Sequence, residues 1–400
     1  MLPRIGLIAL IFAAALLGPA LSLLTGGAVP VVVGTLLAGV ILGRTGFRVV
    51  DPDRSDLSLL YSLGFATLMF SAGMQVPLHD ARVRGALRSG VLAVAAAVPL
   101  ALGAGLLAHA VAGGPAVVYA VVIVSSSAAV ALPIVDENGL TGAAVLTAIA
   151  WITSADILAT LAIPLAIVPK HAAHAALGAL IVSALVAAVF LVAQRLRHLA
   201  WVQHVRQEGK RRMWAIDLRL AVLVLVTLAY VAQQVGASIL VAGFGTGLVV
   251  AAIGGPKRLS REVLGLGQGF LVPLFFVLLG AKLDLRALGH DHRAIVLTAV
   301  LAALTIVVHV LAAMAIRAPR AVGLLSSAQM GVPAAVIALG LPVHAIDQGE
   351  ASAIFCAALL SLATCTVGAG LLRRSSGILK KPGAPRPITR DDGATTRSPS

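Results

Sequence analysis

Long apolar segments recur along almost the whole chain, and they restrict its possible folds more than any other feature. Each is about 18 or more residues long, which is enough to cross a hydrocarbon core of about 30 Å as a helix. The 400 residues are 59 % hydrophobic and 12 % charged, with a mean hydropathy of +1.01. A soluble domain is about 45–50 % apolar and about 25 % charged. We therefore predict an all-α polytopic membrane protein with about thirteen transmembrane helices, at 4–24, 26–43, 57–78, 89–113, 115–136, 141–168, 172–195, 216–235, 237–254, 262–283, 293–317, 320–341 and 349–372.

The first segment has an alternative interpretation. Arg4 precedes an apolar run, as in a secretory signal peptide. The run is long, however, and another apolar segment follows at 29–42. We expect a membrane span.

Basic residues divide unequally between the two sides of this arrangement. The side that holds the N-terminus and the loops after spans 2, 4, 6, 8, 10 and 12 has 8 of the 30 Lys and Arg residues, and the other side has 22. Cytoplasmic loops of membrane proteins are rich in Lys and Arg. We therefore expect a multi-pass protein of the cell membrane with its N-terminus outside and its C-terminus in the cytoplasm. The net charge of +14 reflects this topology, and no nucleic-acid partner is expected.

One carboxylate interrupts an apolar segment near its middle. Asp156 lies within 141–168, where a charged side chain costs from about 2.5 to more than 10 kcal/mol, so it is a functional-site hypothesis. Burial favours a bound proton, whereas a bound cation favours the carboxylate. The alternative is a neutral Asp that bonds to a neighbouring helix.

The two halves of the chain contain similar segments in the same order. "LMFSAGMQVPL" (68–78) matches "FFVLLGAKLDL" (275–285), and "VSSSAAVALP" (124–133) matches "LSSAQMGVPAAVIALG" (325–340). The offset is seven spans, an odd number, so the halves should have opposite orientations. Such inverted repeats are typical of secondary transporters.

The matched polar runs predict two broken helices that cross near the middle of the membrane. Unwound backbone is tolerated there only where it faces protein or a water-filled cavity, and helix ends and hydroxyl groups can hold an ion. The candidate residues are Ser125, Ser126, Ser127, Ser326 and Ser327, with Gln329 as a possible amide ligand. The alternative is that these small residues only permit close helix packing.

The chain resembles the monovalent cation:proton antiporter superfamily, in the branch of sodium/hydrogen exchangers and Kef-type transporters. The resemblance rests on segments in the family's order across most of the chain, namely 31–46, 63–76, 124–140, the helix around Asp156, 241–251, 271–285 and 326–341. It implies antiport of Na⁺ or K⁺ against H⁺ by alternating access, in one membrane transporter domain (1–372) that associates as a homodimer within the lipid bilayer. It also implies core helices at about 57–168 and 262–372, and scaffold or dimer helices at about 1–43 and 172–254.

Two positions depart from the family pattern. Many relatives have a polar residue directly before the essential acid, where this chain has Ala155 after Ser154. A Lys is common in the span after the "PLFF" helix, where this chain has His309. His309 is a candidate partner of Asp156, because the usual pKa of histidine lies near physiological pH. The alternative is a packing residue.

Other functions receive less support. Nucleotide-binding, zinc-protease and serine-hydrolase motifs are absent from the sequence, so we expect neither an enzyme nor a cofactor. The alternatives to cation antiport are a non-transporting membrane sensor and an organic-solute transporter on the same fold.

Lys282 and Asp284 are expected at the external end of their span, and residues 373–400 are expected to form a disordered cytoplasmic tail.

Overall fold

The structure is a computed structural model, and it describes residues 4–25, 29–74, 81–167, 172–212, 214–235, 239–253, 265, 267–286 and 291–375. Regular structure within these ranges is entirely helical. Gln75, which belongs to one of the matched segments, and most of the predicted tail (376–400) lie outside the described residues.

Helices occupy every apolar segment that the sequence predicts. The first half contains α1 (Arg4–Ala15), α2 (Leu17–Leu24), α3 (Val31–Leu42), α4 (Ser55–Met74), α5 (Ala81–Ala112), α6 (Ala116–Val124), α7 (Ala128–Glu137) and α8 (Ala143–Ile167). The second contains α9 (Ala172–Leu196), α10 (Ala200–Arg211), α11 (Ile216–Gln234), α12 (Ile239–Ile253), the π-helical turn η2 (Gly267–Leu271), α14 (Val272–Lys282), α16 (His292–Ala315), α17 (Arg320–Ser326), α18 (Gly331–Gly340) and α19 (Gln348–Ser375).

The lengths of these helices agree with a polytopic membrane protein. Within the described ranges, eight helices are long and apolar enough to cross a membrane, and the bent pair of α17 and α18 raises this to nine. Three further apolar helices are shorter, at Val31–Leu42, Ile239–Ile253 and Gly269–Lys282. The total of thirteen spans stays a prediction.

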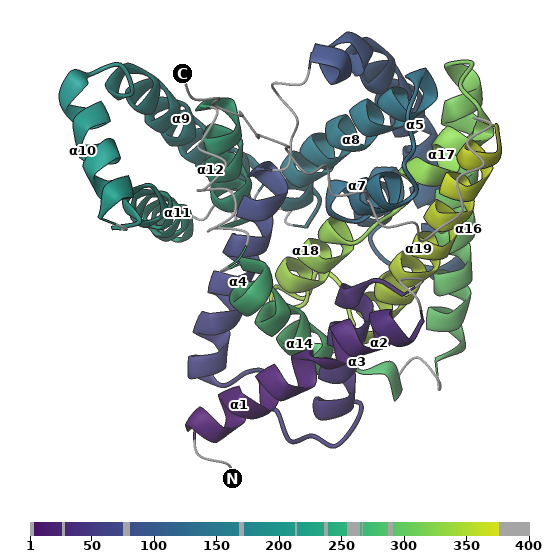
Figure 1. The fold of residues 1–400 in the computed structure, drawn as a ribbon. Coiled ribbons are helices and arrows are strands. Elements are labelled where there is room, and N and C mark those ends of the chain that lie inside the picture. The colour runs from purple at the N-terminus through teal and green to yellow at the C-terminus, as the bar shows by residue number, and fades with distance from the viewer. Residues whose placement is uncertain are drawn as a thin grey trace, which may run out of the picture.

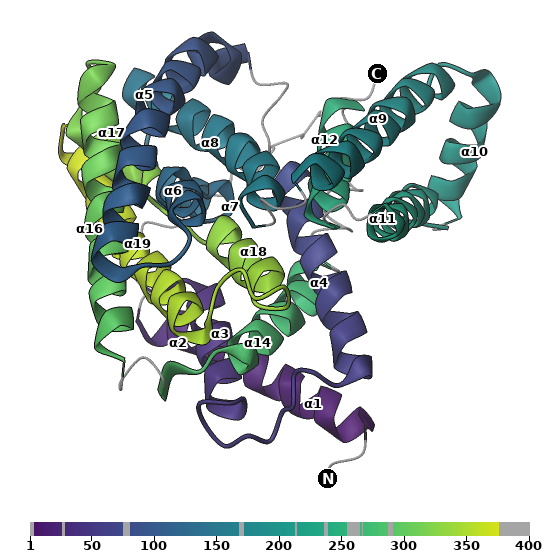
Figure 2. The ribbon, with the colours of Figure 1, turned by 180° about the vertical axis from the view of Figure 1, so that it is seen from behind.

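The helices pack into two bundles (Figures 1 and 2). The crossing bundle contains α5 to α8 and α16 to α19, which contact one another extensively. The outer bundle contains α1 to α4, α9, α11, α12 and α14, with α12 packed on α4 and α14 packed on α3. The bundles meet where α8 contacts α9 and α12, and where α18 contacts α4. The predicted core included 57–78 and 262–283, whereas α4 and α14 pack mainly within the outer bundle.

The helix contacts repeat between the two halves of the chain. The pairing of α3 with α14 corresponds to that of α12 with α4, and the pairing of α5 with α8 corresponds to that of α16 with α19. Likewise, α2 packs on α3 as α11 packs on α12. Each correspondence follows the offset of seven predicted spans. The packing therefore agrees with the internal repeat that the sequence predicts.

Loops that the sequence places on one side of the membrane meet at one end of the molecule. Asp53, in the connection from α3 to α4, pairs with Lys282 at the end of α14 at 3.2 Å. Arg293, at the start of α16, pairs with Glu350 of α19 at 3.5 Å, and the Tyr119 hydroxyl of α6 donates to the same carboxylate at 2.9 Å. These contacts agree with the predicted alternation of the spans.

Candidate functional site

Two helices of the crossing bundle are interrupted within the membrane domain. The first break separates α6 from α7 at residues 125–127, and the second separates α17 from α18 at residues 327–330. The axes of α17 and α18 differ by 40°. Pro115 and Pro319 stand directly before α6 and α17, where the missing N–H of proline costs nothing. Both breaks lie in the serine-containing runs that predicted them.

Each break donates hydrogen bonds to carbonyl groups in the last turn of the other broken helix. The Gln329 amide Nε2 donates to the carbonyl oxygens of Val122 at 2.7 Å and Ile123 at 3.3 Å, in the last turn of α6. In return, the Ser126 hydroxyl donates to the Ser326 carbonyl oxygen, the last residue of α17, at 2.6 Å. Carbonyl groups at a helix end are costly to bury without a partner. These polar side chains therefore stabilise the crossing of the two broken helices.

Asp156 lies in the middle of α8 and faces a cavity of about 470 Å³. The side chain is largely buried, with 8 % of the residue exposed. Ser127 lines the same cavity directly before α7, and Met330 and Gly331 line it at the start of α18. The wall also includes residues of α3, α4 and α14. The cavity therefore lies between the two bundles and beside both helix breaks.

The start of α7 adds a favourable electrostatic contribution at Asp156. The backbone N–H of Ala128, the first residue of α7, interacts with the Asp156 carboxylate. N-terminal helix ends carry a partial positive charge that stabilises an anion nearby. This contact offsets part of the cost of burying the carboxylate.

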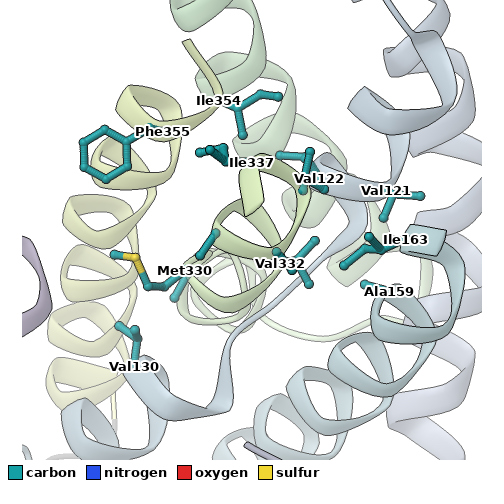
Figure 3. Close-up of a cluster of buried hydrophobic side chains, with 14 of the residues drawn as sticks. Val121, Val122, Val130, Ala159, Ile163, Met330, Val332, Ile337, Ile354 and Phe355 are labelled. Carbon is teal, nitrogen blue, oxygen red and sulfur yellow. The ribbon is translucent and has the colours of Figure 1, made fainter. Parts of the chain in front are cut away.

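Buried apolar side chains pack around α18 (Figure 3). Ile337 extends from α18 on the side of Ile354 of α19, and Val332 extends on the side of Ile163 of α8. All four are at most 2 % exposed. Val332 and Ile163 also line the cavity, whose wall is largely apolar, so that its few oxygen atoms determine what can bind.

Most of the predicted serines make internal hydrogen bonds. Ser125, Ser327 and Ser154 donate to the carbonyl oxygens of Val122, Leu324 and Ala150 at 2.7–2.8 Å, and Ser327 also contacts the Thr364 hydroxyl at 2.8 Å. The Ser326 hydroxyl has no hydrogen-bond partner among the described residues. Ser127 and Asp156 are the predicted residues that the structure brings together in the cavity.

His309 lies apart from the residues that line the cavity. Its ring stacks on Trp151 of α8 with the ring centres 5.4 Å apart. Its Nδ1 is 2.9 Å from the Thr305 carbonyl oxygen, one turn earlier in α16. The residue is completely buried, and Nε2 has no hydrogen-bond partner among the described residues. This environment is that of a packing residue between α8 and α16.

Four residues with hydroxyl groups that line the cavity, Ser22, Thr35, Ser71 and Thr160, were missed in the sequence. Thr160 lines the cavity one turn after Asp156, and the spacing of four residues places both on one helix face. That spacing could have identified Thr160. Thr35 of α3 and Ser71 of α4 also line the cavity, but no sequence signal connects them with Asp156.

The donor set suits a hard cation that is bound weakly. Asp156 is the only carboxylate among the described residues that line the cavity, and the hydroxyls of Ser127 and Thr160 are neutral oxygen donors. Within the described ranges, no three His, Cys, Asp or Glu side chains gather as a metal site. Oxygen donors are the ligands that hard cations prefer.

Comparisons with known proteins find transporters of one type. A protein from Bacillus subtilis, named "Putative Na(+)/H(+) antiporter YjbQ", is 24 % identical over 360 residues, which cover 83 % of this chain and 57 % of the relative. The Na(+)/H(+) antiporter NhaS5 of Synechocystis is 28 % identical over 270 residues, covering 64 % of this chain and 37 % of the relative. The matches thus span about half and about one third of these two relatives. A Na(+)/H(+) antiporter of Enterococcus hirae is 23 % identical over 75 % of this chain and 79 % of its own.

A solved structure has the same fold. The sodium proton antiporter MjNhaP1 from Methanocaldococcus jannaschii superposes with a TM-score of 0.62 at 15 % identity, covering 92 % of this chain and 97 % of its own. This confirms the predicted antiporter fold. The family model for the transmembrane sodium/hydrogen exchanger matches residues 5–372. The chain therefore belongs to the sodium/hydrogen exchanger family.

Proposed function

We propose that this protein exchanges a monovalent cation for a proton across the cell membrane, with Asp156 binding the two in turn. One observation carries the proposal: a buried carboxylate in the middle of a membrane helix lines a cavity between two bundles, beside both helix breaks. The names of the relatives and of the structural neighbour favour Na⁺ as the cation. Transport of K⁺ is a second possibility that the same oxygen donors allow.

The chemistry of exchange follows from competition at one group. A carboxylate in an apolar cavity is unfavourable unless a proton or a cation neutralises it. Because Asp156 has one negative charge, a bound Na⁺ excludes the proton and a bound proton excludes Na⁺. Ser127 and Thr160 supply further oxygen atoms for the cation. The Ala128 N–H stabilises the carboxylate while one ligand replaces the other.

The two bundles suggest how the site reaches both sides of the membrane. The crossing bundle carries Asp156 and both helix breaks, and the outer bundle supplies the opposite wall of the cavity. A movement of one bundle against the other would open the cavity first to one side of the membrane and then to the other. We assign α4 and α14 to the outer, scaffold bundle, because of their packing on α12 and α3.

The proposal also includes the orientation of the protein in the membrane and its oligomeric state. The uneven distribution of Lys and Arg favours a cytoplasmic C-terminus and an external N-terminus. We expect a homodimer that associates through the outer bundle, whose helices α9 and α11 expose many apolar side chains.

The proposal is tested by flux through purified protein in liposomes. An internal pH-sensitive dye should report proton movement when NaCl or KCl is added to wild-type protein. The isosteric change Asp156→Asn should remove the signal, because an amide cannot alternate between a proton and a cation. Ser154→Ala is the matched control, since the Ser154 hydroxyl bonds to a carbonyl oxygen of its own helix.

Two outcomes would contradict the proposal. Wild-type rates in a well-folded Asp156→Asn protein would remove Asp156 from the mechanism. Absence of flux with every alkali ion in the wild-type protein would favour a non-transporting sensor.

A further inference from the structure

An apolar groove lies on the outer bundle, between α4 and α11. Its volume is about 370 Å³. It follows α11 almost from end to end, since Leu218 and Gln233 both line it. Leu59 and Phe70 line it on α4, a separation of about three turns. The groove is therefore an apolar space that extends along most of α11, and its volume is sufficient for much of an acyl chain.

A basic amphipathic helix lies at one end of this groove. Segment 195–219 contains seven Lys and Arg residues and two acidic residues, Glu208 and Asp217, a net charge of +5. It includes α10, which joins α9 to α11 at the edge of the molecule (Figure 1). The sequence suggested only a basic loop here.

Contacts hold α10 against the start of α11. Arg206 Nε donates to the Asp217 carboxylate at 2.8 Å, and Leu218, the next residue, lines the groove. Arg212 lies over the Trp214 ring, 5.4 Å from its centre, and both side chains are exposed. The exposed Arg219 follows on α11. Basic side chains and an aromatic ring thus surround one end of the groove.

We propose that this region binds an anionic phospholipid, with an acyl chain in the groove between α4 and α11 and its headgroup beside Arg212 and Arg219. The net charge of +5 in the adjoining segment supports an anionic headgroup as the ligand. Basic amphipathic helices with exposed Trp lie at membrane surfaces, and Lys or Arg near an anionic surface contributes about 1 kcal/mol each. The site is separate from Asp156, and the inference does not rest on the proposed function.

The binding is tested by thermal unfolding of the purified full chain in detergent. Dioleoyl-phosphatidylglycerol should raise the unfolding temperature more than dioleoyl-phosphatidylcholine. The double change Arg212→Gln and Arg219→Gln should weaken the apparent affinity for phosphatidylglycerol about 30-fold, from about 1 kcal/mol for each lost cation. Arg374→Gln, at the exposed end of α19 on the same predicted face, should leave this affinity unchanged.

The groove is tested by filling it. Ala229→Trp places a large side chain in the groove and should abolish the stabilisation by phosphatidylglycerol. Leu223→Trp is the matched control, because Leu223 is exposed on α11 and is not among the described residues that line the groove. The variant Asp156→Asn should keep the full stabilisation, which separates this site from the proposed exchange.

A second measurement needs no variant. Phosphatidylglycerol with brominated acyl chains should quench the fluorescence of Trp201 and Trp214 more strongly than brominated phosphatidylcholine. Trp151, the third tryptophan, is completely buried and should contribute a constant background. Equal quenching by the two lipids would overturn the proposal, as would stabilisation that survives both the double Arg change and Ala229→Trp. It would also be overturned if phosphatidylglycerol had no effect while Ala229→Trp converted a dimer to a monomer in light scattering.

Discussion

At the scale of single residues, the proposed exchange predicts that the oxygen atoms around Asp156 determine the affinity for the cation. Thr160 lies on the same face of α8 and lines the same cavity. Ser154 is closer to Asp156 in sequence, but its hydroxyl donates to the Ala150 carbonyl oxygen at 2.8 Å. Two hydroxyls on one helix thus have different expected roles.

The change Thr160→Val should therefore raise the apparent KM for Na⁺ and leave protein abundance unchanged. Loss of one oxygen ligand costs about 1–1.5 kcal/mol, which corresponds to a rise of about 5- to 10-fold. Initial rates of exchange over a series of Na⁺ concentrations measure it. Ser154→Ala should keep the wild-type KM, and equal effects of both changes would count against a ligand role for Thr160.

Asp53, in the connection from α3 to α4, makes the free energy of unfolding depend on pH. Partial burial raises the pKa of this carboxyl, but the hydrogen bond from Lys282 and the charges of Lys282 and Arg44 outweigh it, so that the pKa lies below its usual value of 3.8. A lowered pKa contributes stability above pH 3.8 that is lost as the pH falls through the folded-state value. Because Asp53 is more than half exposed, solvent limits this contribution to less than about 1 kcal/mol.

The change Asp53→Asn should lower the unfolding temperature slightly at about pH 6, and the difference should decrease as the pH falls below 3.8. Thermal unfolding in detergent at a series of pH values measures it. A difference that is the same at every pH would show that the ion pair does not cause it.

At the scale of helices, glycines bring α4 and α12 into direct backbone contact. A Cβ atom on Gly247 would lie 2.1 Å from the Phe70 carbonyl oxygen, and one on Gly73 would lie 2.2 Å from that of Phe244. The equivalent pair, α3 and α14, is as close, since a Cβ on Gly39 would lie 2.0 Å from the Val277 carbonyl oxygen. Close approach through small residues is the usual way in which membrane helices associate.

The change Gly247→Ala should thus destabilise the protein by about 1–3 kcal/mol, since the obstructing atoms belong to the α4 backbone. Gly103→Ala is the matched control, because a Cβ there meets no atom within 4 Å. Alanine in the α5 helix should be neutral or stabilise by up to about 1 kcal/mol. Unfolding temperatures of both variants provide the comparison, and equal values would argue against close packing at Gly247.

At the scale of the whole molecule, the number of titrating groups in the cavity determines whether transport moves net charge. Asp156 is the only carboxylate among the described cavity residues, and His309 is held between Trp151 and the Thr305 carbonyl oxygen. In the proposed exchange, one proton would therefore balance one monovalent cation in each cycle.

We expect electroneutral exchange. In proteoliposomes with a clamped membrane potential, the rate should not respond to the potential, whereas transfer of one net charge is worth about 2.3 kcal/mol per 100 mV. His309→Asn should leave the stoichiometry unchanged. A rate that rises steeply with the potential, or a transient current that His309→Asn removes, would make His309 a second proton carrier.

Much of the fold could be predicted because the bilayer imposes a simple rule on the sequence. A helix satisfies its own backbone groups in a solvent that offers no hydrogen bonds, so apolar length alone located the helical segments. The serine runs at 125–127 and 326–327 predicted the breaks for the same reason, since unwound backbone needs polar partners. Asp156 was recognisable because an isolated carboxylate in an apolar helix requires a compensating function.

What the sequence by itself determined is thus local: which segments are apolar, where they break and which one carries an acid. The tertiary structure alone decided which polar groups meet. It directed Gln329 to the end of α6, Ser126 to the end of α17 and Ser127 to the cavity, and it placed His309 against Trp151. It also joined Thr35 and Ser71 to the wall opposite Asp156. The physical reason is that the rotation and depth of each helix depend on packing against its neighbours, which segment length and composition do not specify.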